Sequence, residues 1–192
     1  MDIYDKYLEE SSKVADEQKK LKNIFLSFAE ETKKRVADGG GVYFCGNGGS
    51  AADSQHLAAE LIGRFKRNRM PLKSLALTTD TSIITAISND FSFDDIFTRQ
   101  IEGLCSEKDV LIGISTSGES RNVLNALNLA NKMSMLTISF TNNTENSISK
   151  VSEFSLQIPS TETGIIQQGH ITFGQLLCMY PVSYTHLRAH ET

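Results

Sequence analysis

The first stretch that could do chemistry is FCGNGGSAADSQH, residues 44–56, where a strand-like run stops at a cluster of glycines. Glycines let the backbone turn tightly and approach a ligand closely. The helix expected after them would present free backbone N–H groups and a dipole that favours an anion. Ser50 would then either cap this helix or donate its hydroxyl to a phosphate, and a tight turn with a serine N-cap is the simpler alternative.

A second loop, ISTSGES (residues 114–120), brings four hydroxyl side chains to the end of another expected strand. Hydroxyls and backbone N–H groups suit a phosphate monoester without requiring a lysine. An ordinary Ser/Thr cap is the alternative for this loop taken alone. Because loops after neighbouring parallel strands meet at one sheet edge, the two loops together favour a single phosphosugar site.

Other phosphate-binding patterns fit less well. A P-loop requires Gly-Lys-Ser/Thr, but Gly49 is followed directly by Ser50. The dinucleotide pattern G-x-G-x-x-G/A is met by Gly46, Gly48 and Ala51. An acidic residue should follow about 20 positions later to bind the ribose, whereas Asp80 lies 34 positions after Gly46.

His56 and Glu60 are four residues apart on the helix expected over 50–63 and therefore share one face. This spacing suits two metal ligands, or a ligand beside a general base. A solvated surface pair is the alternative. Gln167 and His170 open the last expected helix and could close over the same pocket. Arg64 begins a basic run that is either a solvated helix end or an anion-facing group.

The elements that must position these residues alternate between strand and helix. Residues 2–38 lack Pro and Gly and show helical periodicity, which predicts one or two helices that pack on their own domain or on a second subunit. Short apolar runs predict strands at 41–46, 74–79, 109–115, 136–141 and 154–158. Helices are expected at 50–63, 82–88, 93–104, 120–133 and 165–179. Such alternation predicts an α/β fold with a doubly wound parallel sheet.

The composition of the 192 residues is that of a soluble globular protein, with a net charge of -4 and no apolar run long enough to span a bilayer. We therefore expect no nucleic-acid surface, no membrane association and no signal peptide. Three widely separated cysteines predict neither a disulfide framework nor a thiol-zinc site, so a cytoplasmic location is expected. Residues 181–192, PVSYTHLRAHET, break the pattern at Pro181 and resemble a cloning-adaptor read-through, so we treat them as a non-native tail.

Four motifs in order, CGNGGSAADSQHLAAELIGRF, ISNDFSFDDIFTRQ, DVLIGISTSGES and IIQQGHITFGQLLC, resemble the sedoheptulose 7-phosphate isomerases, or phosphoheptose isomerases, of the sugar-isomerase (SIS) domain superfamily. The resemblance covers about residues 1–180. It implies a flavodoxin-like five-stranded parallel sheet, with residues 1–40 as a helical segment for oligomer packing and 41–180 as the SIS domain. It also implies a homotetramer that isomerises D-sedoheptulose 7-phosphate to D-glycero-D-manno-heptose 7-phosphate, the first step towards activated heptose of bacterial surface polysaccharides.

The resemblance also assigns residues. The phosphate would lie on Ser115, Thr116, Ser117 and Ser120. The remaining substrate-binding residues would be Asn47, Gly48, Gly49, Ser50, Glu60, Asn89, Asp90 and Gln167. One zinc ion per subunit would be bound by His56, Glu60, Gln167 and a second histidine. Since ketose–aldose isomerisation through an enediol needs a carboxylate base, Glu60 is the expected catalytic base, in competition with its role as a zinc ligand.

One departure from the family pattern bears on activity. The second histidine falls at Gln175, and a glutamine amide does not titrate near neutral pH. Loss of a general acid typically costs about 10² to 10⁴ in rate. His170 on the same expected helix is roughly 140° away from position 175, at about 100° per residue, and so replaces it poorly. The alternatives to an active isomerase are a binding protein associated with the replication initiator and a phosphosugar sensor.

Overall fold

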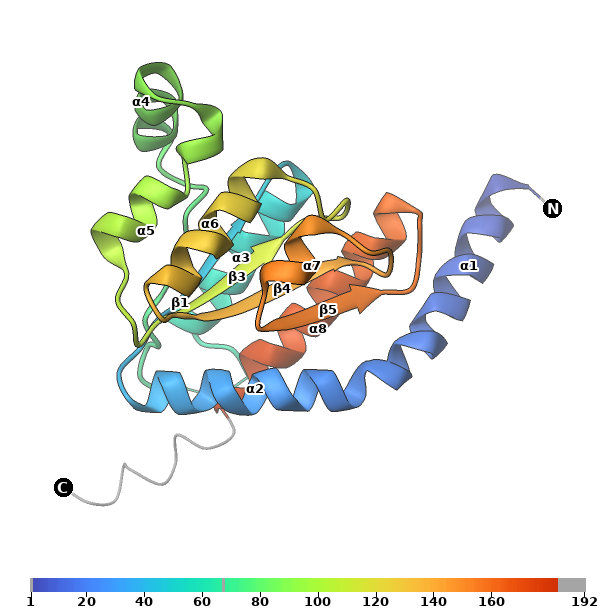
Figure 1. Ribbon diagram of the computed structural model, residues 1–192. Helices are drawn as coiled ribbons and strands as arrows, with labels where there is room; N and C mark the ends of the chain where they lie inside the picture. The colour runs from blue at the N-terminus through green and yellow to red at the C-terminus, as the bar shows by residue number, and fades with distance from the viewer. Residues whose placement is uncertain (1, 67, 183–192) are drawn as a thin grey trace.

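Five parallel strands form one sheet in the order β2-β1-β3-β4-β5 (Figure 1). The computed structural model describes residues 2–66 and 68–182. The strands are β1 (Val42–Gly46), β2 (Ser74–Ala76), β3 (Val110–Ile114), β4 (Leu136–Asn142) and β5 (Phe154–Ile158). All five expected strands are confirmed, as is the doubly wound α/β architecture.

Side chains of the central strands alternate between two cores, so each strand is covered on both faces. Val42 and Phe44 of β1 face a core that contains Leu57 of α3 (Gly49–Ile62). Tyr43 and Cys45 face the opposite core. The first core also includes side chains of α2 (Lys22–Ala37) and α8 (Thr163–Val182), and the second those of α5 (Thr98–Leu104) and α6 (Arg121–Lys132). Burial on both faces explains why the strands read as continuous apolar runs.

The strand register places the two polar loops side by side. Gly46, the last residue of β1, pairs with Ile114, the last residue of β3. The chain therefore leaves both strands at the same level, first into the 47–49 turn and α3, then into the 115–120 loop and α6. The expectation that both loops lie at one sheet edge is confirmed.

The N-terminal region is two α-helices rather than one. α1 (Ile3–Glu17) is followed by a 3-10 turn, η1 (Gln18–Leu21), and by α2. The rings of Phe25 in α2 and Phe173 in α8 lie 5.8 Å apart, so α2 packs on its own domain. α1 extends beyond the edge of the sheet (Figure 1), where Ser11 and Tyr7 contact Gln168 of α8. It leaves Ile3, Tyr4 and Leu8 exposed to 87%, 69% and 50%.

Three expectations about helices are corrected by the structure. The region 93–104 contains a 3-10 turn, η2 (Phe93–Asp95), and α5 rather than one helix, while α4 (Thr81–Asp90) matches its expected range closely. α7 (Ser147–Val151) was not expected, because five residues are too few for a helical period. α8 continues through Pro181 to Val182, since a proline so close to the helix end removes only one late hydrogen bond. The expected tail lies mostly outside the described residues.

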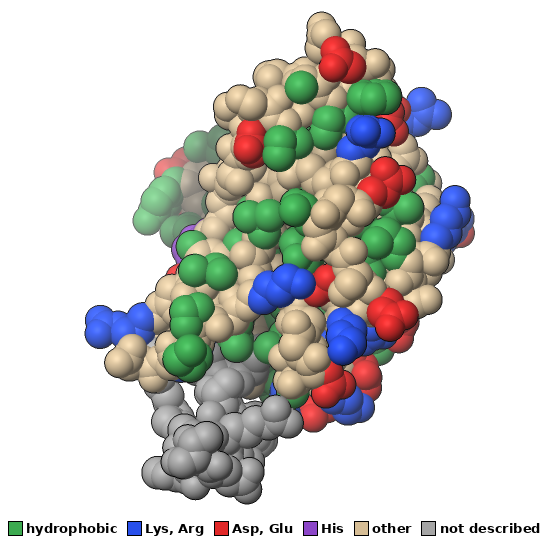
Figure 2. Space-filling view, turned by 90° about the vertical axis from the view of Figure 1, so that its left-hand side faces the viewer, with side chains coloured by type: hydrophobic (Ala, Val, Ile, Leu, Met, Phe, Trp, Pro, Cys, Tyr) green, Lys and Arg blue, Asp and Glu red, His purple; other side chains and the backbone are tan. Residues whose placement is uncertain are grey.

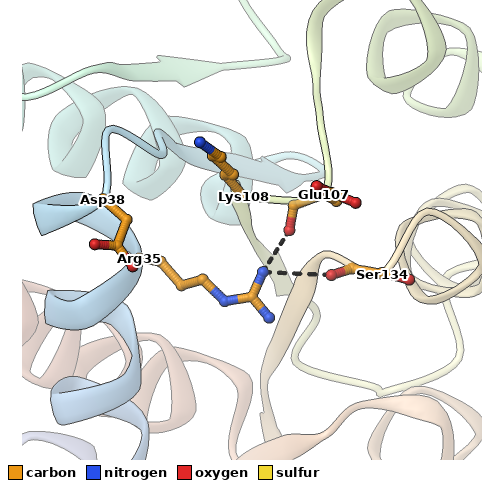
Figure 3. Close-up of a pocket in the computed structure, with 5 residues that line it drawn as sticks. All are labelled: Arg35, Asp38, Glu107, Lys108 and Ser134. Atoms are coloured by element: carbon orange, nitrogen blue, oxygen red, sulfur yellow. Dashed lines mark hydrogen bonds between the residues drawn. The ribbon is translucent and has the colours of Figure 1, made fainter.

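A hollow of about 520 Å³ lies at the amino-terminal end of the sheet (Figure 3). Arg35 from α2 reaches into it, and its Nη1 donates hydrogen bonds to the carbonyl oxygens of Glu107 and Ser134. These carbonyls precede β3 and β4, at the edge opposite the two polar loops. Because the guanidinium already binds backbone carbonyls, we interpret the contacts of Arg35 as a structural connection between α2 and the sheet.

Asp109 is the buried charge that joins the start of β3 to β1. Its carboxylate accepts hydrogen bonds from the backbone N–H groups of Gly41, at 2.6 Å, and Ser106, at 2.7 Å. Lys73 Nζ lies 3.1 Å away. Burial acts to raise the pKa of Asp109, but these hydrogen bonds outweigh it and hold the pKa below its usual value.

We expect Asp109→Asn to lower the free energy of unfolding at pH 7 by about 2–4 kcal/mol, because hydrogen bonds to a charged acceptor are lost in the interior. Because its folded pKa is lowered, the Asp109 carboxylate stabilises the fold at pH values above the unfolded pKa of about 3.9. This contribution is lost as the pH falls through the folded pKa. The difference between the two proteins in urea unfolding should therefore shrink below about pH 4. The exposed Asp38→Asn is the matched control, and a pH-independent difference at Asp109 would contradict the prediction.

Candidate active site

The first loop presents the start of α3 without a side-chain cap. Gly48, with φ of 54°, is the N-cap residue, and no side chain accepts a hydrogen bond there. The alternative of a serine N-cap is therefore wrong, since Ser50 lies one position inside the helix and is 4% exposed. A β-carbon at Gly49 would lie 2.2 Å from Gln167 Nε2 of α8, so only glycine admits this side chain. The uncapped N–H groups suit an anion.

The second loop gathers three serine hydroxyls at one point. Ser115 Oγ lies 3.3 Å from Ser117 Oγ and 3.0 Å from Ser120 Oγ. Ser120 is the N-cap residue of α6, but its side chain makes no capping hydrogen bond. Gly118 turns the chain with φ of 69°, and its N–H donates to Ser115 Oγ. A cluster of hydroxyls at an uncapped helix start is a cradle for a phosphate group.

A reciprocal amide pair connects the two loops. Asn47 Nδ2 donates to Asn122 Oδ1, and Asn122 Nδ2 donates to Asn47 Oδ1, both at 2.9 Å. Asn122 Oδ1 also accepts from the N–H of Val123, and its side chain is buried. Sequence reasoning missed Asn122, although its place two residues after Ser120 at the start of a helix was a usable signal.

Glu119 lies within the phosphate loop, where its charge would repel a phosphate. Its carboxylate instead accepts hydrogen bonds from the N–H and the hydroxyl of Ser147, at 2.8 and 2.6 Å. These bonds to α7 lower the pKa of Glu119 and keep its charge directed away from the serine cluster. A β-carbon at Gly118 would collide with Asn146 at 2.1 Å, so the loop packs closely on the start of α7.

The expected acid–base residues come together between α3 and α8. His56 Nε2 lies 3.1 Å from Glu60 Oε1 and 3.4 Å from Gln175 Nε2. The side chain of Glu60 is 24% exposed and that of His56 is 48% exposed, so both remain accessible to a ligand. Gln167, on the same helix as Gln175, lies over Gly49. The sheet edge thus carries a hydroxyl cluster and an uncapped helix start, and the His–Glu pair lies about two to three turns further along α3.

Asp53 is a second residue that sequence reasoning missed. It lies three positions before His56 and seven before Glu60, so the same helix face carries all three. Its Oδ2 is buried and has no hydrogen-bond partner within the described residues. Burial raises the pKa of Asp53, and the nearby His56 opposes the shift.

Four other expected residues are not joined to this site by hydrogen bonds among the described residues. His170 is fully buried against β4, where its Nε2 lies 3.1 Å from the Thr141 carbonyl oxygen, and burial lowers its pKa to about 4. It therefore does not close over the pocket. Asn89 donates to Asp90 at the end of α4, away from the loops. Arg64 is exposed beyond the last residue of α3, at the opposite end of that helix from Gly49.

A cavity of about 170 Å³ separates the first loop from the α4 region. Gly46, Asn47 and Gly48 line one side of it, and apolar side chains including Ile84 and Phe93 line the other. The α4 region and the first loop therefore face each other across this cavity. It leaves Asn89 and Asp90 as predictions, since they do not line it among the described residues.

The donor types near His56 fit a divalent metal ion. An imidazole nitrogen and a carboxylate are 3.1 Å apart, and the amide groups of Gln167 and Gln175 lie on the facing helix. Nitrogen and oxygen donors of these kinds bind zinc and other divalent ions in proteins. No cluster of three or more His, Cys, Asp or Glu side chains suited to a metal occurs within residues 2–66 and 68–182.

Comparisons with known proteins point to one family. The family model for the SIS domain matches residues 6–142. The phosphoheptose isomerase of Aquifex aeolicus is 45% identical, over 89% of this chain and 94% of its own length. The phosphoheptose isomerase of Geobacter sulfurreducens is 49% identical, over 84% of this chain and 85% of its own length.

Solved structures of the same kind superimpose closely. Phosphoheptose isomerase GmhA from Neisseria gonorrhoeae has a TM-score of 0.88 at 38% identity, covering 94% of this chain and 97% of its own. The phosphoheptose isomerase from Francisella tularensis has a TM-score of 0.89 at 31% identity, covering 94% and 98%.

We expect Asn122→Ala to weaken the binding of inorganic phosphate about tenfold, because Asn47 loses the partner that aligns the two loops. The loss of one to two buried hydrogen bonds, about 1.4 kcal/mol, corresponds to this factor. Isothermal titration calorimetry measures it. Asn125→Ala is the matched control. Asn125 lies one turn further along α6, and its amide donates to the carbonyl oxygen of Asp94. Equal phosphate affinity in wild type and Asn122→Ala would count against the bridge.

Proposed function

The chain belongs to the phosphoheptose isomerase family of SIS domain proteins, and we propose that it isomerises D-sedoheptulose 7-phosphate to D-glycero-D-manno-heptose 7-phosphate, the first step of bacterial nucleotide-activated heptose biosynthesis. The observation that carries the proposal is the His56–Glu60 pair on α3, the helix that starts at one of the two loops that the Asn47–Asn122 pair holds together. The relatives reported above are phosphoheptose isomerases, and none of them favours a non-catalytic binding protein.

The phosphate group would bind in the loop after β3. The hydroxyls of Ser115, Ser117 and Ser120 already converge there, and Thr116 lies between them. The start of α6 adds backbone N–H groups and the positive end of its dipole. With the phosphate held at this point, the sugar chain extends along the sheet edge towards Asn47, Gly48, Gly49, Ser50 and α3. Asn89 and Asp90 remain further predicted contacts.

Glu60 is the proposed base. Isomerisation moves a proton between C1 and C2 of the sugar through an enediol, so a carboxylate must reach the carbon-bound proton. His56, 3.1 Å away, fixes the orientation of the Glu60 carboxylate. The amide N–H groups of Gln167 and Gln175 can donate hydrogen bonds to the sugar oxygens and stabilise the developing negative charge, but they cannot transfer a proton.

Zinc remains the proposed metal, one ion per subunit. His56, Glu60 and Gln167 would hold it. When bound, such an ion polarises the sugar oxygens at the reacting carbons. The roles of Glu60 as base and as metal ligand compete. A mutation of Glu60 removes both roles at once and measures their combined contribution.

The proposed assembly is a homotetramer in the cytoplasm. α1 supports the assembly, because Ile3, Tyr4 and Leu8 form an apolar stripe that its own domain leaves exposed. The buried thiols of Cys45 and Cys178 are free, which suits a reducing compartment. No helix in the described residues has the length and apolar character to cross a membrane. On the face shown in Figure 2, basic and acidic side chains are intermixed, so that face shows no broad basic patch for nucleic acid.

Glu60→Gln should reduce kcat for sedoheptulose 7-phosphate by about 10² to 10⁴, the usual contribution of a general base. The substitution keeps the size of the side chain, so the dissociation constant of the sugar phosphate should change by less than about threefold if phosphate binding dominates affinity. Coupled assays give kcat and calorimetry gives affinity. Glu102→Gln, at an exposed position of α5, is the control. Wild-type turnover by Glu60→Gln would remove Glu60 from the mechanism.

Leu8→Glu should dissociate the assembly, because a charge placed in a desolvated apolar contact is costly. Light scattering coupled to size-exclusion chromatography measures the molar mass. Lys13→Glu introduces the same side chain at an exposed polar position of α1 and should leave the mass unchanged. An unchanged mass for Leu8→Glu would show that the α1 stripe is not part of the subunit contact.

A further inference from the structure

The contact between His56, Glu60 and Gln175 is internally inconsistent as a set of hydrogen bonds. His56 Nε2 faces both Glu60 Oε1, at 3.1 Å, and Gln175 Nε2, at 3.4 Å. A ring nitrogen of a neutral histidine carries either one proton or one lone pair. It can therefore donate to the carboxylate or accept from the amide, but it cannot do both. One of the two contacts is unsatisfied in either tautomer.

Turning the Gln175 amide removes this inconsistency and brings oxygen atoms to Nε2 from two sides, an arrangement that can also hold a cation between the three groups. The oxygen and nitrogen of a glutamine amide are assigned from their surroundings, so the carbonyl oxygen of Gln175 can face His56 equally well. The lone pair of Nε2, the Glu60 carboxylate and the Gln175 carbonyl oxygen would then all act as donors to one ion. Atoms that share an ion at about 2.1 Å lie about 3.0 to 3.4 Å apart, which agrees with the separations of 3.1 and 3.4 Å.

The donor set is rich in oxygen. It contains one imidazole nitrogen, one carboxylate and the amide oxygen of Gln175. Structural and catalytic zinc sites are built mainly from nitrogen, thiolate and carboxylate donors, whereas carbonyl and carboxylate oxygens suit harder ions such as Mn²⁺ and Mg²⁺. In the described residues no third His, Cys, Asp or Glu completes a metal cluster with His56 and Glu60. A neutral amide is also a weaker donor than an imidazole.

We propose that Gln175 makes the His56–Glu60 pocket a weak, exchangeable divalent-metal site with a reduced preference for Zn²⁺ over Mn²⁺. The inference rests on the proposed function only because membership of the family implies a metal. The metal affinity itself is a property of this chain's side chains and does not require turnover.

The test is a pair of metal titrations on metal-free protein without substrate. Competition with a chelating indicator gives the Zn²⁺ dissociation constant, and electron paramagnetic resonance of free Mn²⁺ gives that for Mn²⁺. We expect Gln175→His to tighten Zn²⁺ binding by at least about tenfold, the usual effect of an added ligand. The dissociation constant for Mn²⁺ should change by less, because Zn²⁺ gains more affinity than Mn²⁺ from a nitrogen donor. His56→Ala should abolish measurable binding of both ions.

Gln168→His is the matched control. It makes the same substitution on the same helix, but the Gln168 amide contacts Ser11 and Tyr7 of α1 rather than His56. It should leave both affinities unchanged. Gln175→Glu is a second variant in case the histidine disturbs folding. It preserves the side-chain shape and should tighten both ions by at least about tenfold, because it replaces a neutral donor with a charged one.

Four results would overturn the inference: wild type that binds Zn²⁺ as tightly as Gln175→His, equal tightening by Gln168→His, binding that survives His56→Ala, or no metal binding by wild type and both position-175 variants. Isomerase assays on the same samples separate this inference from the proposed function. Absent turnover with the expected affinities would count against the function alone, and normal turnover with unexpected affinities would count against the inference alone.

Discussion

The reciprocal hydrogen bonds between Asn47 and Asn122 are the constraint on which the site depends. Each loop leaves its own strand and starts its own helix, and the sheet register fixes only where the two loops begin. The amide pair fixes how they continue, because two bonds of 2.9 Å hold the turn before α3 against the first turn of α6. A phosphate bound at one loop therefore has a defined position relative to the acid–base face of α3.

α3 carries two parts of the candidate site, the glycine turn at its start and the His56–Glu60 pair, which the helical period places on one face. Its start lies at the glycine turn, and His56 and Glu60 follow on one face about two and three turns later. α8 packs against this face and contributes Gln167 near the start and Gln175 near His56. Gly49 and Gly174 permit this close packing, since a β-carbon at Gly174 would lie 2.4 Å from Leu57. The distance between the glycine turn and the His56–Glu60 pair is thus set by the length of one helix.

The sequence was sufficient for the strands, the two loops and the His56–Glu60 pair, because these depend on local patterns of burial, glycine and helical spacing. It was insufficient for Asn122 and Asp53, because their roles arise from contacts across the fold and from burial. His170 shows the same limit in reverse. Its position three residues after Gln167 suggested the pocket, but the two positions differ by about 60° around the helix, and here that rotation turns His170 into the interior. Asn89 and Asp90 remain predictions, since their place in a site depends on partners beyond α4.

The proposed phosphate site would bind a dianion mainly with neutral groups, and this has consequences for its specificity. The hydroxyls of the 115–120 loop and the N-termini of α3 and α6 supply partial positive charge at one edge, because parallel topology points both helix dipoles there. Glu119 is held away by Ser147, and the exposed Arg121 lies 4.0 Å from Asp94. Neutral donors fixed by the fold recognise the shape of a phosphate monoester more than its charge. Binding should therefore depend on the phosphate's position at the end of the sugar chain, and the proposed mechanism requires the other end of that chain to reach Glu60.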